Sequence, residues 1–157
     1  MRALLCIVLL LVLVSSAAAS DGALFRRANG STIVFPGAVR AWCGAKRLNV
    51  FSLARRIRES RWQLQIARKH VRSGGVVRFS WRRENGIRIF VYDAKTRNEA
   101  SDGAAGSHGT VTLRRASCRL GHLVEIGLSG TIASEFSDGR PVRVSGTYRG
   151  RIGTRPG

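Results

Sequence analysis

Arginine and tryptophan side chains carry the most distinctive chemistry in this 157-residue sequence. Between Arg40 and Arg83 there are 13 Lys and Arg residues and a single acid, Glu59, and the same segment holds all three tryptophans. A guanidinium group can donate two parallel hydrogen bonds to a phosphate, sulfate or carboxylate, and it can stack on an aromatic ring. The segment therefore has the composition of an anion-binding surface.

The remaining charge is distributed differently along the chain. Residues 84–139 carry 6 basic and 7 acidic residues, and residues 140–157 add 5 basic residues and no acid. Thirteen basic residues minus one acid thus place +12 of the formal +18 in one segment. The arginines that we expect to bind an anion are Arg61, Arg78, Arg82, Arg83 and Arg88. The alternative is a solvated face that only keeps the protein soluble.

Metal-binding and catalytic patterns are scarce in comparison. The sequence has no phosphate-binding glycine loop, zinc-ligand spacing or Gly-x-Ser-x-Gly motif. His70, His108 and His122 form no metal-ligand spacing motif and are most simply solvated or hydrogen-bonded surface residues. Glu125 and Glu135 could be the paired carboxylates of a glycosidase, but Glu125 is expected to face solvent on a strand. We therefore predict no metal site and no cofactor, and we favour a protein without catalytic activity.

Three acids lie in a stretch from Asp93 to Gly109 that is rich in Ala, Gly, Ser, Asn and Asp. This composition without periodicity predicts a long loop. Asp93, Glu99 and Asp102 could supply oxygen ligands to Ca²⁺, or together with His108 they could form the site of a secreted hydrolase. The simpler interpretation is a polar loop whose Asp and Asn side chains stabilise turns.

The elements that position these residues are expected to follow a signal peptide, residues 1–19. Arg2, the apolar run from Leu4 to Val14 and the alanines from Ala17 to Ala19 form the three parts of such a peptide. Cleavage near Ala19 would make the protein secreted or periplasmic. An uncleaved anchor is the alternative, although the run is marginal for spanning a bilayer. No second apolar stretch of that length follows, so we expect no transmembrane segment after cleavage.

The cysteines fit an oxidising compartment. Cys6 would leave with the signal peptide, so that Cys43 and Cys118 remain as a pair. We predict a disulfide between them. Their separation, 118 − 43 = 75 residues, corresponds to a stabilisation of about 4 kcal/mol from chain entropy. Two free thiols, or a thiol nucleophile, are the alternatives.

Short β-strands dominate the predicted secondary structure. Residues 61–66 alternate, with Trp62, Leu64 and Ile66 on one side, which indicates a half-buried strand. Residues 31–35, 110–113, 123–128, 130–133 and 141–148 also have strand composition. Residues 48–58 fit either a short helix or a strand.

The clearest local signal is a β-hairpin between Val76 and Asp93. Apolar residues alternate with polar ones on both sides of Asn85-Gly86, a dipeptide that favours a type I′ turn. Trp81 shares the parity of the apolar positions in this pattern, as Trp62 does in its own strand. We therefore expect both tryptophans in the core.

Together these patterns predict one all-β domain, an antiparallel β-sandwich or partly open barrel of about seven to eight strands. The domain would span residues 31–152, after a flexible segment at 20–30 and before a disordered tail at 153–157. The strong bias of 24 Arg to 3 Lys suggests GC-rich coding and a bacterial source.

The function that these features favour is a binding module whose basic face holds an anionic partner. Such a partner could be an envelope polymer, a lipid headgroup or an acidic protein, and no specific nucleic acid is expected. The alternatives are a secreted hydrolase with its site in residues 93–109 and a secreted interaction or inhibitor protein. Sequence patterns leave the oligomeric state open.

Overall fold

The structure, a computed structural model, describes residues 22–36, 40–53, 60–83, 85–135 and 140–155. The predicted signal peptide lies outside these residues. The strands are β1 (Gly22–Arg26), β2 (Thr32–Pro36), β3 (Arg40–Cys43), β4 (Arg47–Leu53), β5 (Arg61–Ala67), β6 (Gly75–Ser80), β7 (Ile87–Asp93), β8 (Asn98–Ser101), β9 (His108–Arg115), β10 (Leu123–Ser134) and β11 (Val142–Arg151). One short 3₁₀ turn, η1 (Arg68–His70), precedes β6. The all-β prediction is confirmed, with eleven strands in the described residues instead of seven or eight.

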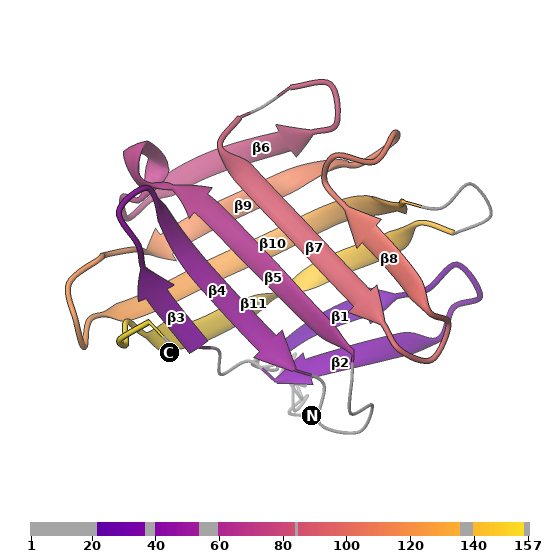
Figure 1. The fold of residues 1–157 in the computed structure, drawn as a ribbon, viewed down its shortest axis with the longest axis horizontal. Coiled ribbons are helices and arrows are strands. Elements are labelled where there is room, and N and C mark those ends of the chain that lie inside the picture. The colour runs from indigo at the N-terminus through magenta and orange to yellow at the C-terminus, as the bar shows by residue number, and fades with distance from the viewer. Residues whose placement is uncertain (1–21, 37–39, 54–59, 84, 136–139, 156–157) are drawn as a thin grey trace, which may run out of the picture.

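The strands form one curled antiparallel sheet, a half-barrel with two layers that cross in Figure 1. We call β3-β4-β5-β7-β8, in the order of their pairing, the front layer. The back layer is β2-β1-β11-β10-β9-β6. The last residues of the long strand β10, Ala133 and Ser134, pair with β8 and so continue one layer into the other.

The core lies between the two layers because each strand turns alternate side chains inward. Trp62, Leu64 and Ile66 of β5 are fully buried, so the prediction for Trp62 is confirmed. The Trp62 ring lies 4.1 Å from the ring of Tyr148 on β11, measured between centroids. Three buried polar atoms have no hydrogen-bond partner among the described residues: Ser52 Oγ, Trp62 Nε1 and Tyr148 Oη. Burial raises the pKa of Tyr148 well above its ordinary value.

The predicted hairpin around Asn85-Gly86 is wrong. Strand β6 pairs with β9 in the back layer, whereas β7 pairs with β5 and β8 in the front layer. Residues 81–83 and 85–86 lie in the crossover between the layers. Phe79 of β6 packs over Gly109 of β9, where a Cβ atom would lie 2.5 Å from the Phe79 ring. This close contact is possible because residue 109 is a glycine and has no Cβ atom.

Residues 93–109 are not one long loop, so that prediction is also wrong. Asn98–Ser101 form β8, which pairs with both β7 and β10, and β9 begins at His108. The sequence of β8 has no apolar alternation. The strand is held in place by backbone pairing on both of its edges. Arg97, at φ +54°, completes the turn before it.

Two further segments form strands in the structure. Residues 48–53, left open between helix and strand, belong to β4, and residues 54–59 lie outside the described residues. Residues 22–26, in the segment expected to be flexible, form β1 between β2 and β11. Phe25 of this strand is completely buried and contacts the ring of Phe35 at a centroid distance of 4.9 Å.

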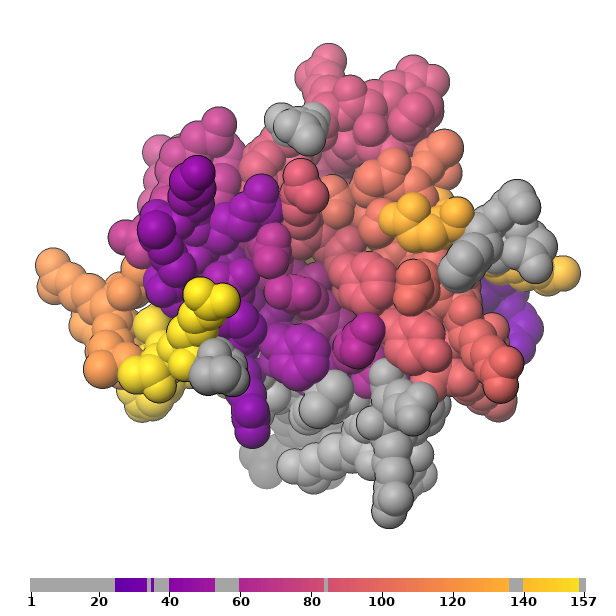
Figure 2. Space-filling model, viewed as in Figure 1, coloured from indigo at the N-terminus to yellow at the C-terminus, as the bar shows by residue number. Residues whose placement is uncertain are grey.

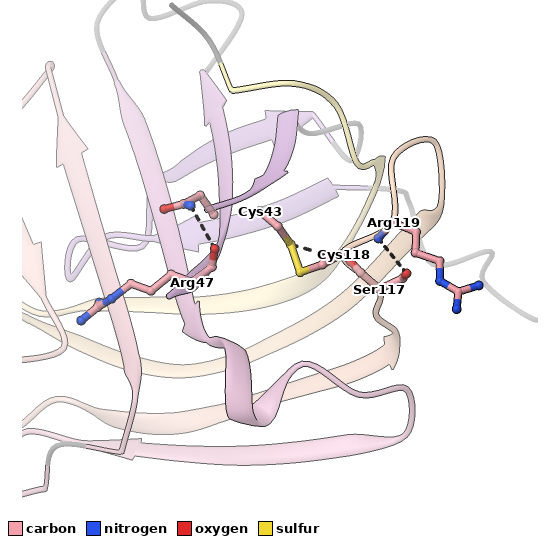
Figure 3. The surroundings of a disulfide bond; sticks show 6 residues. Cys43, Arg47, Ser117, Cys118 and Arg119 are labelled. Carbon is pink, nitrogen blue, oxygen red and sulfur yellow. Dashed lines mark hydrogen bonds between the residues drawn. A yellow bond between two sulfur atoms is a disulfide. The ribbon is translucent and has the colours of Figure 1, made fainter. Parts of the chain in front are cut away.

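The predicted disulfide between Cys43 and Cys118 is confirmed (Figure 3). It links the end of β3, at the edge of the front layer, to the connection between β9 and β10 in the back layer, with the Cα atoms 5.5 Å apart. Beside it, the amide of Gly153 donates a hydrogen bond of 2.8 Å to the carbonyl of Ala41. The two layers are thus joined at one side by β10 and at the other by the disulfide.

Candidate functional site

The outer face of the front layer displays large polar and aromatic side chains. In the register of β5 and β7, Gln65 lies opposite Arg88, and Gln63 lies opposite Phe90. On each strand, the residues directly before and after these side chains are buried in the core. Because side chains alternate along a strand, these four side chains point outward. The face therefore combines amide, guanidinium and aromatic groups on adjacent strands.

This face carries a groove of about 560 Å³. Figure 2 shows the molecule from the side of this face. Its floor is formed by the outward side chains of β5 and β7, and the crossover after β6 borders it. The polar and aromatic residues that line it are Arg47, Gln63, Gln65, Ser80, Trp81, Arg83, Arg88, Phe90, Ser101, Asp102 and Glu135. The volume is within the range of about 300–1,000 Å³ that is typical of small-ligand sites.

Three arginines line the groove from different elements. Arg47 comes from β4, Arg83 from the crossover and Arg88 from β7. Arg47 Nη1 donates a hydrogen bond of 3.0 Å to Oε1 of Gln65, which orients both side chains. An arginine held in this way loses less side-chain entropy when it binds an anion.

Two carboxylates also line the groove. Asp102 Oδ1 accepts a hydrogen bond of 2.6 Å from the backbone amide of Ile89, and Glu135 accepts one from the hydroxyl of Ser101. Burial raises the pKa of Asp102, against the opposing effects of the Ile89 amide and the charge of Arg88. The groove therefore contains both signs of charge.

Trp81 is 44% exposed and lines the groove, so its predicted place in the core is wrong. Strand β6 ends at Ser80, and the parity of the strand does not continue into the crossover. The amide of Trp81 donates a hydrogen bond of 3.0 Å to the carbonyl of Ser107, and the Arg82 guanidinium lies 5.0 Å from the indole ring. The ring is thus held at the surface as an aromatic platform.

The arginines expected to bind an anion divide between the layers. Arg83 and Arg88 line the groove, and Arg82 stacks on Trp81. Arg61 of β5 lies over the ring of Tyr92 at 5.5 Å, on the same outer face. Arg78 is exposed on β6 and pairs with Thr110, so it belongs to the back layer.

Sequence reasoning did not select several of the groove residues. Arg47, Gln63 and Gln65 were not chosen as site residues, although the outward parity of the two glutamines is visible in the sequence. Only the pairing of β4 with β5 brings Arg47 beside Gln65. A search for outward-facing amides on strands next to arginines would have found the two glutamines.

The acids of residues 93–109 are not gathered at one place. Asp93 is buried in an ion pair with Arg27, whose Nη2 donates to Oδ1 at 2.8 Å and whose Nε donates to Oδ2. Burial alone would raise the pKa of Asp93, but the hydrogen bonds from Arg27 and Thr96 lower it overall. Asp102 lies at the opposite end of the β7–β8 hairpin, and His108 begins β9 in the back layer.

Two features are absent from the described part of the chain. No three His, Cys, Asp or Glu side chains lie together there as metal ligands, and no helix there is long and apolar enough to cross a membrane. No family model, curated protein or solved structure matches the sequence or the fold significantly. The groove geometry is therefore the basis for assigning a function.

Proposed function

We propose that this protein is an exported, non-catalytic binding module and that its front-layer groove holds an anionic ligand. The observation that carries the proposal is the presence of Arg47, Arg83 and Arg88 in one groove. Guanidinium groups from separate elements can contact one anionic ligand from several sides, with charge-assisted hydrogen bonds.

The charge of the whole chain supports this proposal. Cleavage of the signal peptide would remove Arg2 and leave 26 basic against 9 acidic residues, a net charge of +17. A field of this sign raises the rate at which anions reach the protein surface. Export is supported by the N-terminal pattern and by the disulfide, because such bonds persist in oxidising compartments.

Binding without catalysis is supported by the groove's side chains. The charged groups Arg47, Asp102 and Glu135 each accept or donate a hydrogen bond within the protein. Such an arrangement orients groups for recognition.

The test is heparin binding by the mature protein, measured by calorimetry at several NaCl concentrations. Affinity should fall steeply with salt. The variant Arg47→Gln/Arg83→Gln should lose about tenfold or more, because a hydrogen bond to a charged group is worth about 1.5–3 kcal/mol. The matched control is Arg26→Gln/Arg143→Gln, which removes two exposed charges from the back layer.

The control separates the groove from the net charge. It should bind heparin within about twofold of the wild type, because distant exposed charges are screened by salt. An equal loss in the two double variants would show that net charge alone governs binding. A wild-type protein that binds neither heparin nor another anionic polymer would overturn the proposed function.

A further inference from the structure

The charge of the groove changes sign along the order of the strands. Arg47 lies on β4 and Arg88 on β7, whereas Asp102 follows β8 and Glu135 follows β10. A polyanion without hydroxyl groups would bring some of its anions against the two carboxylates and would offer these carboxylates no hydroxyl donor. Like charges placed opposite each other at a binding surface cost affinity. The groove thus disfavours a polyanion that has no hydroxyl groups beside its charges.

Neutral hydrogen-bonding and aromatic groups lie among the charged side chains of the groove. The amides of Gln63 and Gln65 lie on the floor beside Phe90, and Trp81 stands at the border. Oε1 of Gln65 accepts from Arg47, and the NH₂ group of the same amide can donate to a ligand. Amides that both donate and accept, next to an exposed indole ring, match a ligand with many hydroxyls and apolar ring faces.

We infer that the ligand is an acidic oligosaccharide, a chain of sugar rings that carries carboxylates among free hydroxyls. This inference rests on the proposed function and names its ligand class. The carboxylate is held by the arginines, while ring hydroxyls donate hydrogen bonds to Asp102 and Glu135. One sugar ring lies against Trp81. The arginines and the carboxylates of the groove then each meet a ligand group of opposite or complementary polarity.

The experiment compares oligogalacturonate with polyglutamate of the same number of carboxylates. Both probes carry the same acid group, but only the first has sugar rings. The wild-type protein should bind oligogalacturonate about tenfold more tightly, from the added hydrogen bonds and ring contact. Equal affinities would overturn the inference and favour an acidic protein as the ligand, while heparin binding would keep the proposed function.

The variant Asp102→Asn/Glu135→Gln gives the sharpest discrimination. Both replacements keep a carbonyl oxygen for the Ile89 amide and the Ser101 hydroxyl, so the local structure is preserved. Oligogalacturonate affinity should fall about fivefold because charged acceptors for hydroxyls are lost, whereas polyglutamate affinity should rise because repulsion is removed. A rise for both probes would show that the carboxylates only repel, and would overturn the inference.

Two further variants complete the comparison. Trp81→Ala removes an exposed side chain, so folding should be unaffected, and it should weaken oligogalacturonate about fivefold with little change for polyglutamate. An equal loss for both probes contradicts a sugar-stacking role. The control Glu99→Gln/Glu125→Gln neutralises two acids outside the groove and should leave oligogalacturonate binding within twofold. If the wild type binds neither these probes nor heparin, the proposed function itself is wrong.

Discussion

The two layers of the half-barrel present outer faces of very different chemistry. The front face carries long side chains, Gln63, Gln65 and Arg88 among them, in a groove bordered by the crossover. The back face has a shallow hollow over β9, β10 and β11. Its lining residues are mostly small, namely Thr110, Thr112, Arg114, Gly127, Leu128, Ser129, Ser145, Gly146 and Thr147.

The difference shows that strand alternation alone does not make a site. Both layers turn every second residue outward, but the front-face groove also has walls from other elements, the crossover and the segment after β8. On the back face, Glu125 lies 3.3 Å from Arg114 and 3.6 Å from Arg149, so it offsets part of the positive charge of the two arginines. The front layer therefore combines its charged side chains with a walled groove.

The largest expected effect concerns the buried ion pair that joins the layers. Arg27 follows β1 in the back layer, and Asp93 ends β7 in the front layer. Arg27→Met would leave a buried carboxylate without its partner, and should lower the free energy of unfolding by up to about 5 kcal/mol. Urea denaturation at pH 7 measures this loss.

In the same variant, the effect of acidification on stability should have the opposite sign to that in the wild type. In the wild type the pKa of Asp93 is lowered, so its stabilisation is present above about pH 4 and is lost as the pH falls through the folded-state value. In Arg27→Met, burial without a partner should raise that pKa, and acidification from pH 7 should then increase stability. Parallel pH profiles for the two proteins would contradict the role of the pair.

The disulfide is the second connection between the layers. Cys43→Ser/Cys118→Ser should lower the free energy of unfolding by about 4 kcal/mol, because the unfolded chain regains the entropy of an open loop. Denaturation of the oxidised protein with and without reductant should reproduce the loss. If loss of the disulfide loosens only the front-layer groove, heparin affinity will fall before the far-ultraviolet circular dichroism of the strands changes. A loss below about 1 kcal/mol would show that β10 and the ion pair suffice.

A smaller effect is expected in the core that both layers share. Tyr148 Oη is buried without a hydrogen-bond partner. Tyr148→Phe keeps the ring against Trp62 and should raise the free energy of unfolding by about 1 kcal/mol, since it removes an unsatisfied polar group. Thermal denaturation measures the shift. A clear loss of stability would mean that the hydroxyl has a partner in solution.

The smallest effect is a pH dependence confined to the front face. Because burial raises the pKa of Asp102, this carboxyl becomes neutral at a higher pH than an ordinary aspartate. Affinity for polyphosphate, whose internal phosphates stay ionised, should therefore rise modestly as the pH falls toward that value. The rise in affinity should be smaller in Asp102→Asn. This comparison separates the effect of Asp102 from the effect of histidine protonation. An unchanged profile in that variant would assign the effect to other groups.

Local sequence patterns predicted the strands better than their partners. The alternation in β5 correctly placed Trp62 in the core, and the cysteine count correctly paired Cys43 with Cys118. The Asn85-Gly86 signal failed because a turn dipeptide reports only local backbone preference, while six residues between β6 and β7 allow the chain to change layers. Trp81 was misplaced for the same reason, since it lies in that crossover.

What the sequence by itself determined is the all-β class, the disulfide and the concentration of positive charge between Arg40 and Arg83. These follow from alternation, composition and residue counts, which are local properties. Only the tertiary structure decided that Arg78 lies in the back layer while Arg47, Arg83 and Arg88 meet in one groove with two acids. Long-range strand pairing made this choice, because it depends on packing between segments that no local pattern describes.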